Sequence, residues 1–237
     1  MCIFRDVFIT VRKGAIAMLL EVQNINMEYK GGYSVLKDVN FHIDSGEVVG
    51  LIGLNGAGKS TIMRIVSGVS TYQEGKIFFE GSQIKKLSGI QRKKIAFLCA
   101  SNNLYEDMTV ADNLDVFMRF YHATNLDKQY MIDKLDLRNI LKRKVKKLSA
   151  GMQQRVAIAC SMVGRPKLVM MDEPTVLLDF ENKCKIIRFI QSQISPEIGI
   201  LITSHDSSDM EELCKRVYIL KQGEIIKELK VNQNGGN

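Results

Sequence analysis

One stretch of the sequence has the residue types and spacing that suit a chain of phosphates. "GLNGAGKST", residues 53–61, follows the apolar run "VVGLI" and opens an amphipathic segment. Glycines allow the backbone N–H groups to surround phosphate oxygens, and the dipole of a following helix favours an anion. The lysine offers a charge to the β- and γ-phosphates and the serine hydroxyl suits Mg²⁺. We therefore expect a phosphate-binding loop made of Gly53, Leu54, Asn55, Gly56, Ala57, Gly58, Lys59, Ser60 and Thr61.

A second stretch, "LVMMDEP" at residues 168–174, adds two carboxylates. An aspartate that ends a buried apolar strand is costly unless a cation compensates it, so we expect Asp172 to reach the Mg²⁺ shell. Glu173 could polarise an attacking water, a role typically worth roughly 10²–10⁴ in rate, or it could be a solvated loop residue. His205 follows another apolar run at the sheet edge where ligands bind in α/β folds. From its spacing alone, His205 could equally be a structural residue or a residue that contacts the γ-phosphate.

A third stretch, "LSAGMQQ" at residues 148–154, resembles a second anion-binding helix start. Ser149 precedes a glycine at the beginning of a helical pattern, and backbone N–H groups at such a position can bind phosphate. A plain helix cap is the alternative interpretation of Ser149. This stretch lies far along the chain from the phosphate-binding loop, which raises the question of why one chain carries two phosphate-binding stretches.

The elements that must position these residues follow an α/β pattern. Apolar or alternating runs predict strands at 19–29, 38–43, 48–53, 75–84, 168–171 and 198–203, and a terminal hairpin at 217–226. Val110, Leu114, Phe117, Met118 and Tyr121 share one face at helical spacing after a capping Thr109. A helix between the last two buried strands should bury Ile186, Ile187, Ile190 and Ile194, which makes a βαβ unit. Ser208 and Glu211 form a capping-box pattern for one more helix.

Composition excludes several classes of protein. The 237 residues are 46% hydrophobic, carry a formal net charge of +7 and contain no apolar run long enough for a membrane span. Charged residues interrupt the N-terminal apolar segment, which therefore lacks the core of a signal peptide. The five cysteines form no close pair, so we expect reduced thiols rather than disulfides or metal ligands. The basic run at 142–147 lacks the interleaved aromatics of a nucleic-acid platform, and we expect no nucleic-acid partner.

The ordered set "GLNGAGKST", "LSAGMQQR", "LVMMDEP", "TVLLD" and "SHD" resembles the nucleotide-binding subunit of ATP-binding cassette (ABC) transporters over about residues 18–229. The resemblance implies a P-loop NTPase cassette: an α/β, RecA-like core, an antiparallel β subdomain and an inserted helical subdomain. It implies ATP and Mg²⁺ as ligands, with Lys59, Glu173 and His205 catalytic and Ser60 and Asp172 at the metal. It also places Tyr29 against the adenine.

The same resemblance explains the distant "LSAGMQQ" stretch. Cassettes of this family pair head to tail, and the signature helix of one subunit covers the ATP held by the other. Ser149 and Gly151 would therefore contact the nucleotide of a partner cassette, and Asp179 would communicate across the dimer. The partner is a second copy of this chain or a different cassette.

The sequence departs from the family pattern in three places. Ala100 occupies the place of a glutamine that touches Mg²⁺ and relays to the membrane subunit, and an alanine cannot ligate a metal. In the signature, Ala150 replaces a glycine and Met152 a glutamine. Leu177 replaces a small residue at a tight interface. Since the Lys59, Asp172, Glu173 and His205 set is intact, hydrolysis is still expected.

We therefore expect an ATPase subunit, cytoplasmic and peripheral at the inner face of the cell membrane, that energises a separate permease. The segments "LYEDMTVADNL" and "SSDMEELCKRVYIL" are most similar to cassettes that export drugs, sodium or antibiotic peptides. Two alternatives stay open: a regulatory cassette that hydrolyses weakly, and a non-transport cassette acting on nucleic acid or the ribosome. The non-transport alternative is disfavoured, because this sequence contains neither a long coiled coil nor a second cassette.

The expected organisation is a single cassette domain at 18–230, with its helical subdomain at about 100–163 and a frayed tail at 231–237. Residues 1–17 have no counterpart in most cassettes of this kind. Met18 is well placed as a start, because Lys13, Gly14 and Ala15 can be encoded by a ribosome-binding sequence upstream of it. We expect residues 1–17 to be an often untranslated extension or a loose arm.

Overall fold

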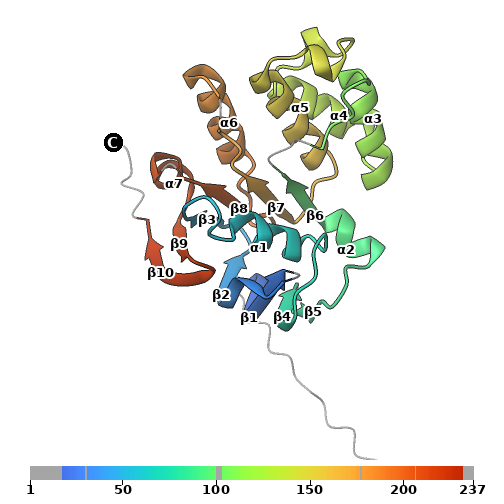
Figure 1. Cartoon of the computed structure of the whole chain (residues 1–237). Coiled ribbons are helices and arrows are strands. Elements are labelled where there is room, and N and C mark those ends of the chain that lie inside the picture. Colours follow the sequence, from blue (N-terminus) through green and yellow to red (C-terminus); the bar gives the residue numbers. More distant parts are fainter. Residues whose placement is uncertain (1–17, 30, 100–102, 177, 206, 232–237) are drawn as a thin grey trace, which may run out of the picture.

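The computed structural model describes residues 18–29, 31–99, 103–176, 178–205 and 207–231 (Figure 1). The expected extension at 1–17 and most of the expected tail lie outside the described residues. The strands are β1 (Met18–Tyr29), β2 (Tyr33–Asp44), β3 (Val48–Ile52), β4 (Glu74–Phe79), β5 (Ser82–Gln83), β6 (Ile95–Leu98), β7 (Leu168–Asp172), β8 (Gly199–Ser204), β9 (Arg216–Lys221) and β10 (Glu224–Lys230). The helices are α1 (Lys59–Val66), α2 (Gly89–Lys94), α3 (Val110–Tyr121), α4 (Asn125–Lys134), α5 (Ala150–Met162), α6 (Phe180–Ser192) and α7 (Ser207–Leu213), with 3₁₀ turns at Arg138–Ile140 and Val145–Lys147.

A six-stranded sheet in the order β10-β9-β3-β8-β7-β6 forms the centre of the molecule. Strands β9, β3, β8, β7 and β6 are parallel, and β10 closes one edge as an antiparallel hairpin with β9. All residues of β7 and β8 are buried. Such continuous apolar strands are expected where both faces of a parallel sheet are covered.

Alternate side chains of this sheet pack into two separate hydrophobic cores, one on each face. Val169 and Met171 of β7 point into a cluster with α5, α6 and α7. Leu168 and Met170 point to the opposite face, into a cluster with α1 and the strands β1, β2 and β4. Because successive strand residues face opposite sides, one apolar run supplies both cores. The carboxyl ends of the strands are thereby fixed between two layers.

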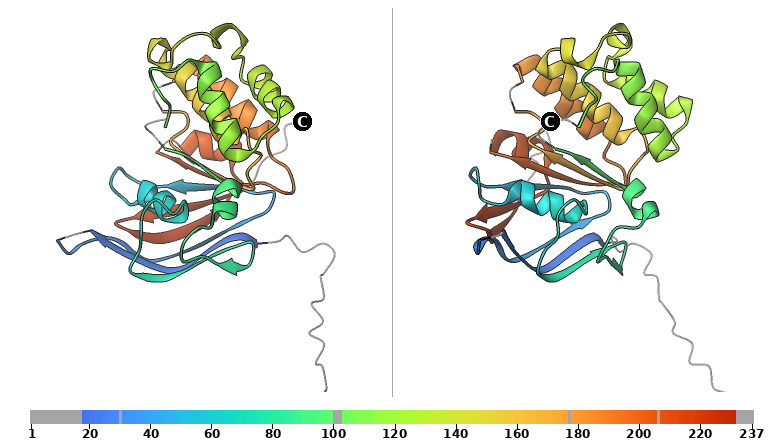
Figure 2. Two further views of the ribbon diagram at one scale, coloured as in Figure 1. Left: turned by 90° about the vertical axis from the view of Figure 1, so that its right-hand side faces the viewer. Right: turned by 45° about the vertical axis from the view of Figure 1, so that its right-hand side comes forward.

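The layer on the α1 side is a four-stranded antiparallel sheet in the order β2-β1-β4-β5. Its strands β1 and β2 form a hairpin in which Tyr29 pairs with Tyr33. The turn between them contains Gly31 and Gly32, whose φ angles of 104° and 79° favour glycine. Figure 2 shows this sheet beneath the six-stranded sheet, with α1 between them.

The opposite layer is helical and lies above the sheet in both views of Figure 2. Thr109 and Thr124 cap α3 and α4, each in a capping box that pairs the threonine with an aspartate three residues later. In Figure 1, α5 lies between α6 on one side and α3 with α4 on the other. Helix α5 is buried over most of its length, so it anchors this layer.

Several local expectations need correction. The stretch 75–84 is a hairpin, β4 and β5, because Glu80 and Gly81 turn the chain with φ angles of 50° and 73°. Ile194 lies beyond the end of α6 and is 37% exposed, whereas the other three isoleucines are buried. Helix α7 begins at Ser207, so Ser208 is inside the helix and does not cap it. The short elements α2 and β6 have no counterpart in the sequence-based expectation, whereas the α3 face, its Thr109 cap and the terminal hairpin are confirmed.

Candidate functional site

The phosphate-binding loop connects β3 to α1 and depends on close backbone approaches. Gly56 and Gly58 have φ angles of 80° and 110°, which side-chain-bearing residues rarely adopt. A Cβ on Gly53 would lie 2.5 Å from the Leu220 carbonyl oxygen, and a Cβ on Gly58 would lie 2.7 Å from Leu36. Glycines are therefore required here for packing against β9 and β2 as well as for turning.

Lys59 is the first residue of α1, and its side chain turns back into the loop. Its ammonium donates to the carbonyl oxygens of Gly53, at 2.7 Å, and Leu54, at 3.3 Å. Only 5% of the residue is exposed, so a buried positive charge lies at the start of a helix. The neighbouring Ser60 is exposed. The loop thus offers a cation, a hydroxyl and a helix N-terminus in one turn, a combination that binds phosphate.

The carboxylates lie at the end of β7, beside β8. Asp172 is 6% exposed, and its Oδ1 accepts a hydrogen bond from the Thr203 hydroxyl at 2.7 Å. The backbone N–H of Glu173 donates to the same Thr203 hydroxyl oxygen at 2.9 Å. Thr203 therefore fixes both acidic residues. The sequence-based interpretation missed it because a threonine in an apolar β8 run looks like an ordinary β-branched strand residue.

Glu173 lies between a lysine and a histidine. Its Oε1 is 3.7 Å from Lys59 Nζ, and its Oε2 is 3.5 Å from His205 Nδ1. Its φ of 51° is in the left-handed region, which costs free energy in a residue with a side chain. The hydrogen bond to Thr203 supports this backbone conformation and aims the carboxylate at the loop. The structure thus brings together Lys59, Asp172, Glu173 and His205 from three strand ends.

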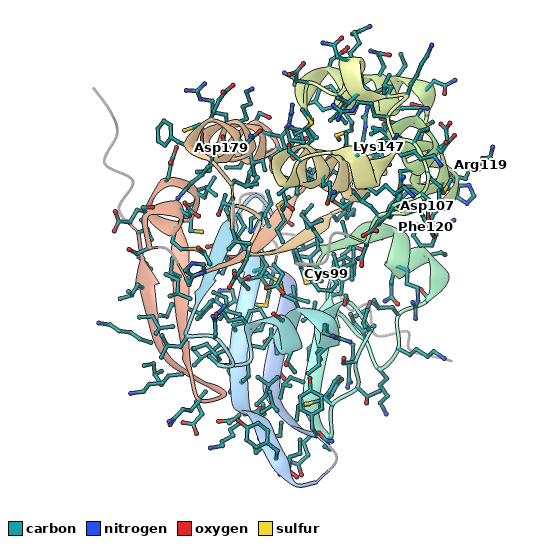
Figure 3. The ribbon with its side chains drawn as sticks, turned by 45° about the horizontal axis from the view of Figure 1, so that its top comes forward. Cys99, Asp107, Arg119, Phe120, Lys147 and Asp179 are labelled. Carbon is teal, nitrogen blue, oxygen red and sulfur yellow. The ribbon has the colours of Figure 1, made fainter. Side chains whose placement is uncertain are left out.

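The start of α5 contacts the start of α6. Ser149 caps α5 by accepting from the Met152 N–H. Asn182 lies over Gly151, where a Cβ would approach Asn182 Cγ to 2.8 Å. Asn182 also donates to Asp179 through its backbone N–H at 2.9 Å and its side-chain amide at 2.7 Å. Figure 3 shows Asp179 at the start of α6, which lies beside α5.

These hydrogen bonds hold the pKa of the exposed Asp179 carboxyl below its usual value, the backbone N–H of Asn182 contributing most. A further link joins the two stretches, because Gln154 Nε2 of α5 donates to the Pro174 carbonyl oxygen at 2.9 Å. The sequence-based interpretation passed over both Gln154 and Asn182. A glutamine or asparagine among polar helix residues carries no signal that distinguishes it from solvated neighbours.

The remaining expected residues are spread around this centre. Tyr29 is 48% exposed at the end of β1, opposite Tyr33, which is 70% exposed. The following part of β2 approaches the loop, since a Cβ on Gly58 would lie 3.3 Å from the Val35 carbonyl oxygen. Strand β2 thus approaches the phosphate-binding loop at Val35, two residues after Tyr33. The departures at Ala100 and Leu177 lie outside the described residues.

The comparisons agree with this geometry. Residues 36–176 match the family model described as ABC transporter. The lantibiotic transport ATP-binding protein SrtF of Streptococcus pyogenes is 37% identical, over 89% of this chain and 90% of its own length. The phosphonates import ATP-binding protein PhnC 2 of Oceanobacillus iheyensis is 35% identical, with 88% and 89% covered. A dimeric post-hydrolysis cassette bound to ADP and inorganic phosphate is 26% identical, with a TM-score of 0.82 over 90% of this chain and 99% of the other.

The fold is therefore that of an ABC cassette, with the RecA-like core, antiparallel sheet and helical layer expected from the sequence. Within the described part of the chain, no helix has the length and apolar character needed to cross a bilayer. The matching family model and relatives make this chain a member of the ABC transporter ATP-binding family, an ATPase subunit that energises transport through a separate permease.

Proposed function

We propose that this ATPase powers the export of an antimicrobial peptide, drug or ion. The observation that carries the ATPase part is the position of Glu173 between Lys59 and His205 at the edge of the sheet. The export part rests on the similarity to the Nod factor export ATP-binding protein I of Rhizobium leguminosarum, which is 33% identical over 88% of this chain and 68% of its own length, and the cargo class on the lantibiotic transport protein. A phosphonate importer is almost as similar, so direction and cargo need a direct test.

Within one site, Lys59 binds the β- and γ-phosphates together with the backbone of residues 53–61, and Tyr29 stacks on the adenine. Ser60 and Asp172 supply the hard oxygen donors that Mg²⁺ prefers, and Thr203 fixes Asp172 for that role. When bound, Mg²⁺ neutralises charge on the phosphates. Glu173 accepts a proton from the attacking water, and His205 contacts the γ-phosphate. The carboxylate of Glu173 is already oriented by its backbone hydrogen bond.

Two cassettes complete each site. Ser149 and Gly151 of one chain cover the nucleotide that residues 53–61 of the other chain hold, and Asp179 communicates between the two sites. The dimeric structural relative supports this pairing. The permease binds the cassettes at the inner face of the cell membrane. The partner cassette is a second copy of this chain or a different cassette.

The test is a transport assay in cells that produce this chain together with its permease. Cells that produce both proteins should survive a lantibiotic or drug at concentrations that kill cells producing Lys59→Ala with the same permease. Accumulation of the labelled compound outside inverted vesicles, rather than inside, would reject export. Retained protection by the Lys59→Ala chain would reject ATP-driven transport as its cause.

A further inference from the structure

A cavity of about 450 Å³ lies where the C-terminal end of α4 meets α5 and α6. Its volume is within the range of small-molecule sites, roughly 300–1,000 Å³. Four cationic residues line it, Lys134, Arg155, Lys185 and Arg188, against one carboxylate, Asp136. We refer to it as the basic cavity. It is separate from the residues of the ATP site described above.

Two of the four cations already face a carboxylate, and one of them is Arg155, whose Nη1 lies 3.5 Å from Asp136 Oδ2. Lys185 pairs with Glu181 at 2.6 Å. Within the described ranges, Lys134 and Arg188 form no ion pair. The Lys134 ammonium lies over the Tyr130 ring, 5.7 Å from its centre. Unpaired cations that share a concave surface raise the local concentration of anions. The basic cavity thus favours a ligand with several negative charges.

Arg155 gives the basic cavity a buried donor. The residue is 7% exposed, and its Nη1 donates to the carbonyl oxygens of Leu135, at 2.9 Å, and Asp136, at 3.2 Å. Among the described residues its Nε–H has no hydrogen-bond partner, but this atom is closed to solvent, so a ligand in the cavity would meet the outer Nη atoms of the guanidinium. A phosphate oxygen is a strong acceptor for these N–H groups. Leu135 and Phe189 add apolar surface to the same lining.

We propose that the basic cavity binds a phosphate-bearing small molecule through Arg155 and Arg188, with Lys134 as a third charge. Planar guanidinium groups suit phosphate oxygens in pairs, and two of them come from different helices here. The ligand therefore joins α5 to α6. Arg155 lies one turn after Gly151 on α5, and Arg188 lies on the helix that Asp179 caps. Binding stiffens the pair of helices that carries the proposed contacts to the partner cassette.

Inorganic pyrophosphate is the probe for this site, titrated into the Lys59→Ala protein to weaken binding in the phosphate-binding loop. Calorimetry should detect saturable binding, and Arg188→Gln should weaken it about tenfold, the loss expected for one charge-assisted hydrogen bond. Arg119→Gln is the matched control, because Arg119 lies on α3 at the far end of the helical layer from Asp179 (Figure 3). The control should bind as tightly as its parent. Thermal unfolding without the probe checks that each variant is folded.

A second readout locates the ligand independently of affinity. The ¹H–¹⁵N resonance of the Arg155 Nε–H, assigned by its loss in Arg155→Lys, should shift as pyrophosphate saturates the protein. A Nε–H resonance that stays fixed at saturation overturns the proposal. Equal affinities for Arg188→Gln and Arg119→Gln, or no binding, also overturn it. The proposed export function is unaffected by these outcomes, since neither measurement needs turnover or the permease.

Discussion

The Thr203 hydroxyl donates to Asp172, with the two oxygens 2.7 Å apart, and its oxygen accepts from the backbone of the next residue, Glu173. One side chain of β8 thus positions both acidic residues at the end of β7. Asp172 and Thr203 are direct neighbours in the parallel register of these strands. Any shift of β8 against β7 would disturb both carboxylates together.

Thr203→Val keeps the shape of the side chain but removes the hydroxyl. Asp172 then loses its buried donor, so the free energy of unfolding should fall by about 1–3 kcal/mol. The apparent affinity for Mg²⁺ in the ATPase assay should fall roughly 10–100-fold, as for other residues that orient metal ligands. Thr203→Ser retains the hydroxyl and should keep most of both properties. A valine variant with the Mg²⁺ dependence of the unaltered protein would contradict the positioning role.

Glu173→Gln keeps the size of the side chain and removes its capacity to accept a proton from water. ATP should still bind, and turnover should fall by roughly 10²–10⁴. Because bound nucleotide then persists between two cassettes, ATP should convert the variant into a stable dimer. Size-exclusion chromatography with and without ATP measures this change. Hydrolysis at the unaltered rate would remove Glu173 from the proposed mechanism.

Gly151→Ala tests the contact between α5 and α6. The added Cβ would lie 2.8 Å from Asn182 Cγ, so the Asn182 side chain must move away from Asp179. We expect a loss of about 1–2 kcal/mol in stability, as for a methyl group added at a packed site. Since hydrogen bonds from Asn182 lower the pKa of Asp179, this pKa should rise toward its ordinary value of about 3.9. Carboxyl ¹³C shifts against pH give that pKa.

Asn182→Ala combined with Gly151→Ala supplies the control for this prediction. Asn182→Ala removes the two atoms that a Cβ on Gly151 would approach to 2.8 Å and leaves Asn182 Cβ at 3.2 Å, so most of the destabilisation by Gly151→Ala should disappear in the double variant. The pKa of Asp179 should be raised in the Asn182→Ala chain alone. Additive losses of stability in the double variant would show that the contact does not cause the effect.

The sequence was sufficient to predict five of the six strands of the central sheet, all except β6. Apolar runs before Asp172 and His205 are long and bounded by polar residues, and the six-residue spacing of the loop glycines and lysine is specific. The residues around α2 and β6 were harder to interpret. Helix α2 has no buried residue, so it lacks the apolar face on which periodicity depends. β6 contributes only four residues, too few to establish an alternation.

The contacts that connect the motifs could not be predicted, because they join distant parts of the chain. Thr203 and Asp172 are 31 residues apart, and Gln154 and Pro174 are 20 apart. Their partners are set by the strand register and by the packing of α5 over β7, neither of which a local pattern contains. The positive φ of Glu173 could not be predicted either, because the residue is not a glycine and nothing in the local sequence indicates this conformation. The motifs therefore identified the chemical groups, and the fold determined their orientation.

The final prediction concerns whether Ser149 serves its own chain or a partner. A Lys59→Ala chain has a damaged phosphate-binding loop and an intact signature, whereas a Ser149→Arg chain has the reverse. In a mixed dimer that pairs loop with signature across the interface, the two intact halves meet in one complete site. The other site has both halves damaged. If each signature covered the ATP of its own chain, every site in the mixture would contain one defect.

The measurement is ATP-dependent dimerisation of an equimolar mixture by size-exclusion chromatography, with Glu173→Gln in both chains so that hydrolysis does not disperse the dimer. The mixture should dimerise at lower ATP concentrations than either parent variant. An introduced arginine can attract phosphate by its charge, so Ser149→Leu provides a neutral control of similar bulk. Ser149 caps α5 at the molecular surface, so both replacements should leave the fold intact. A mixture that dimerises no better than its parents would mean that Ser149 does not act on the partner's nucleotide.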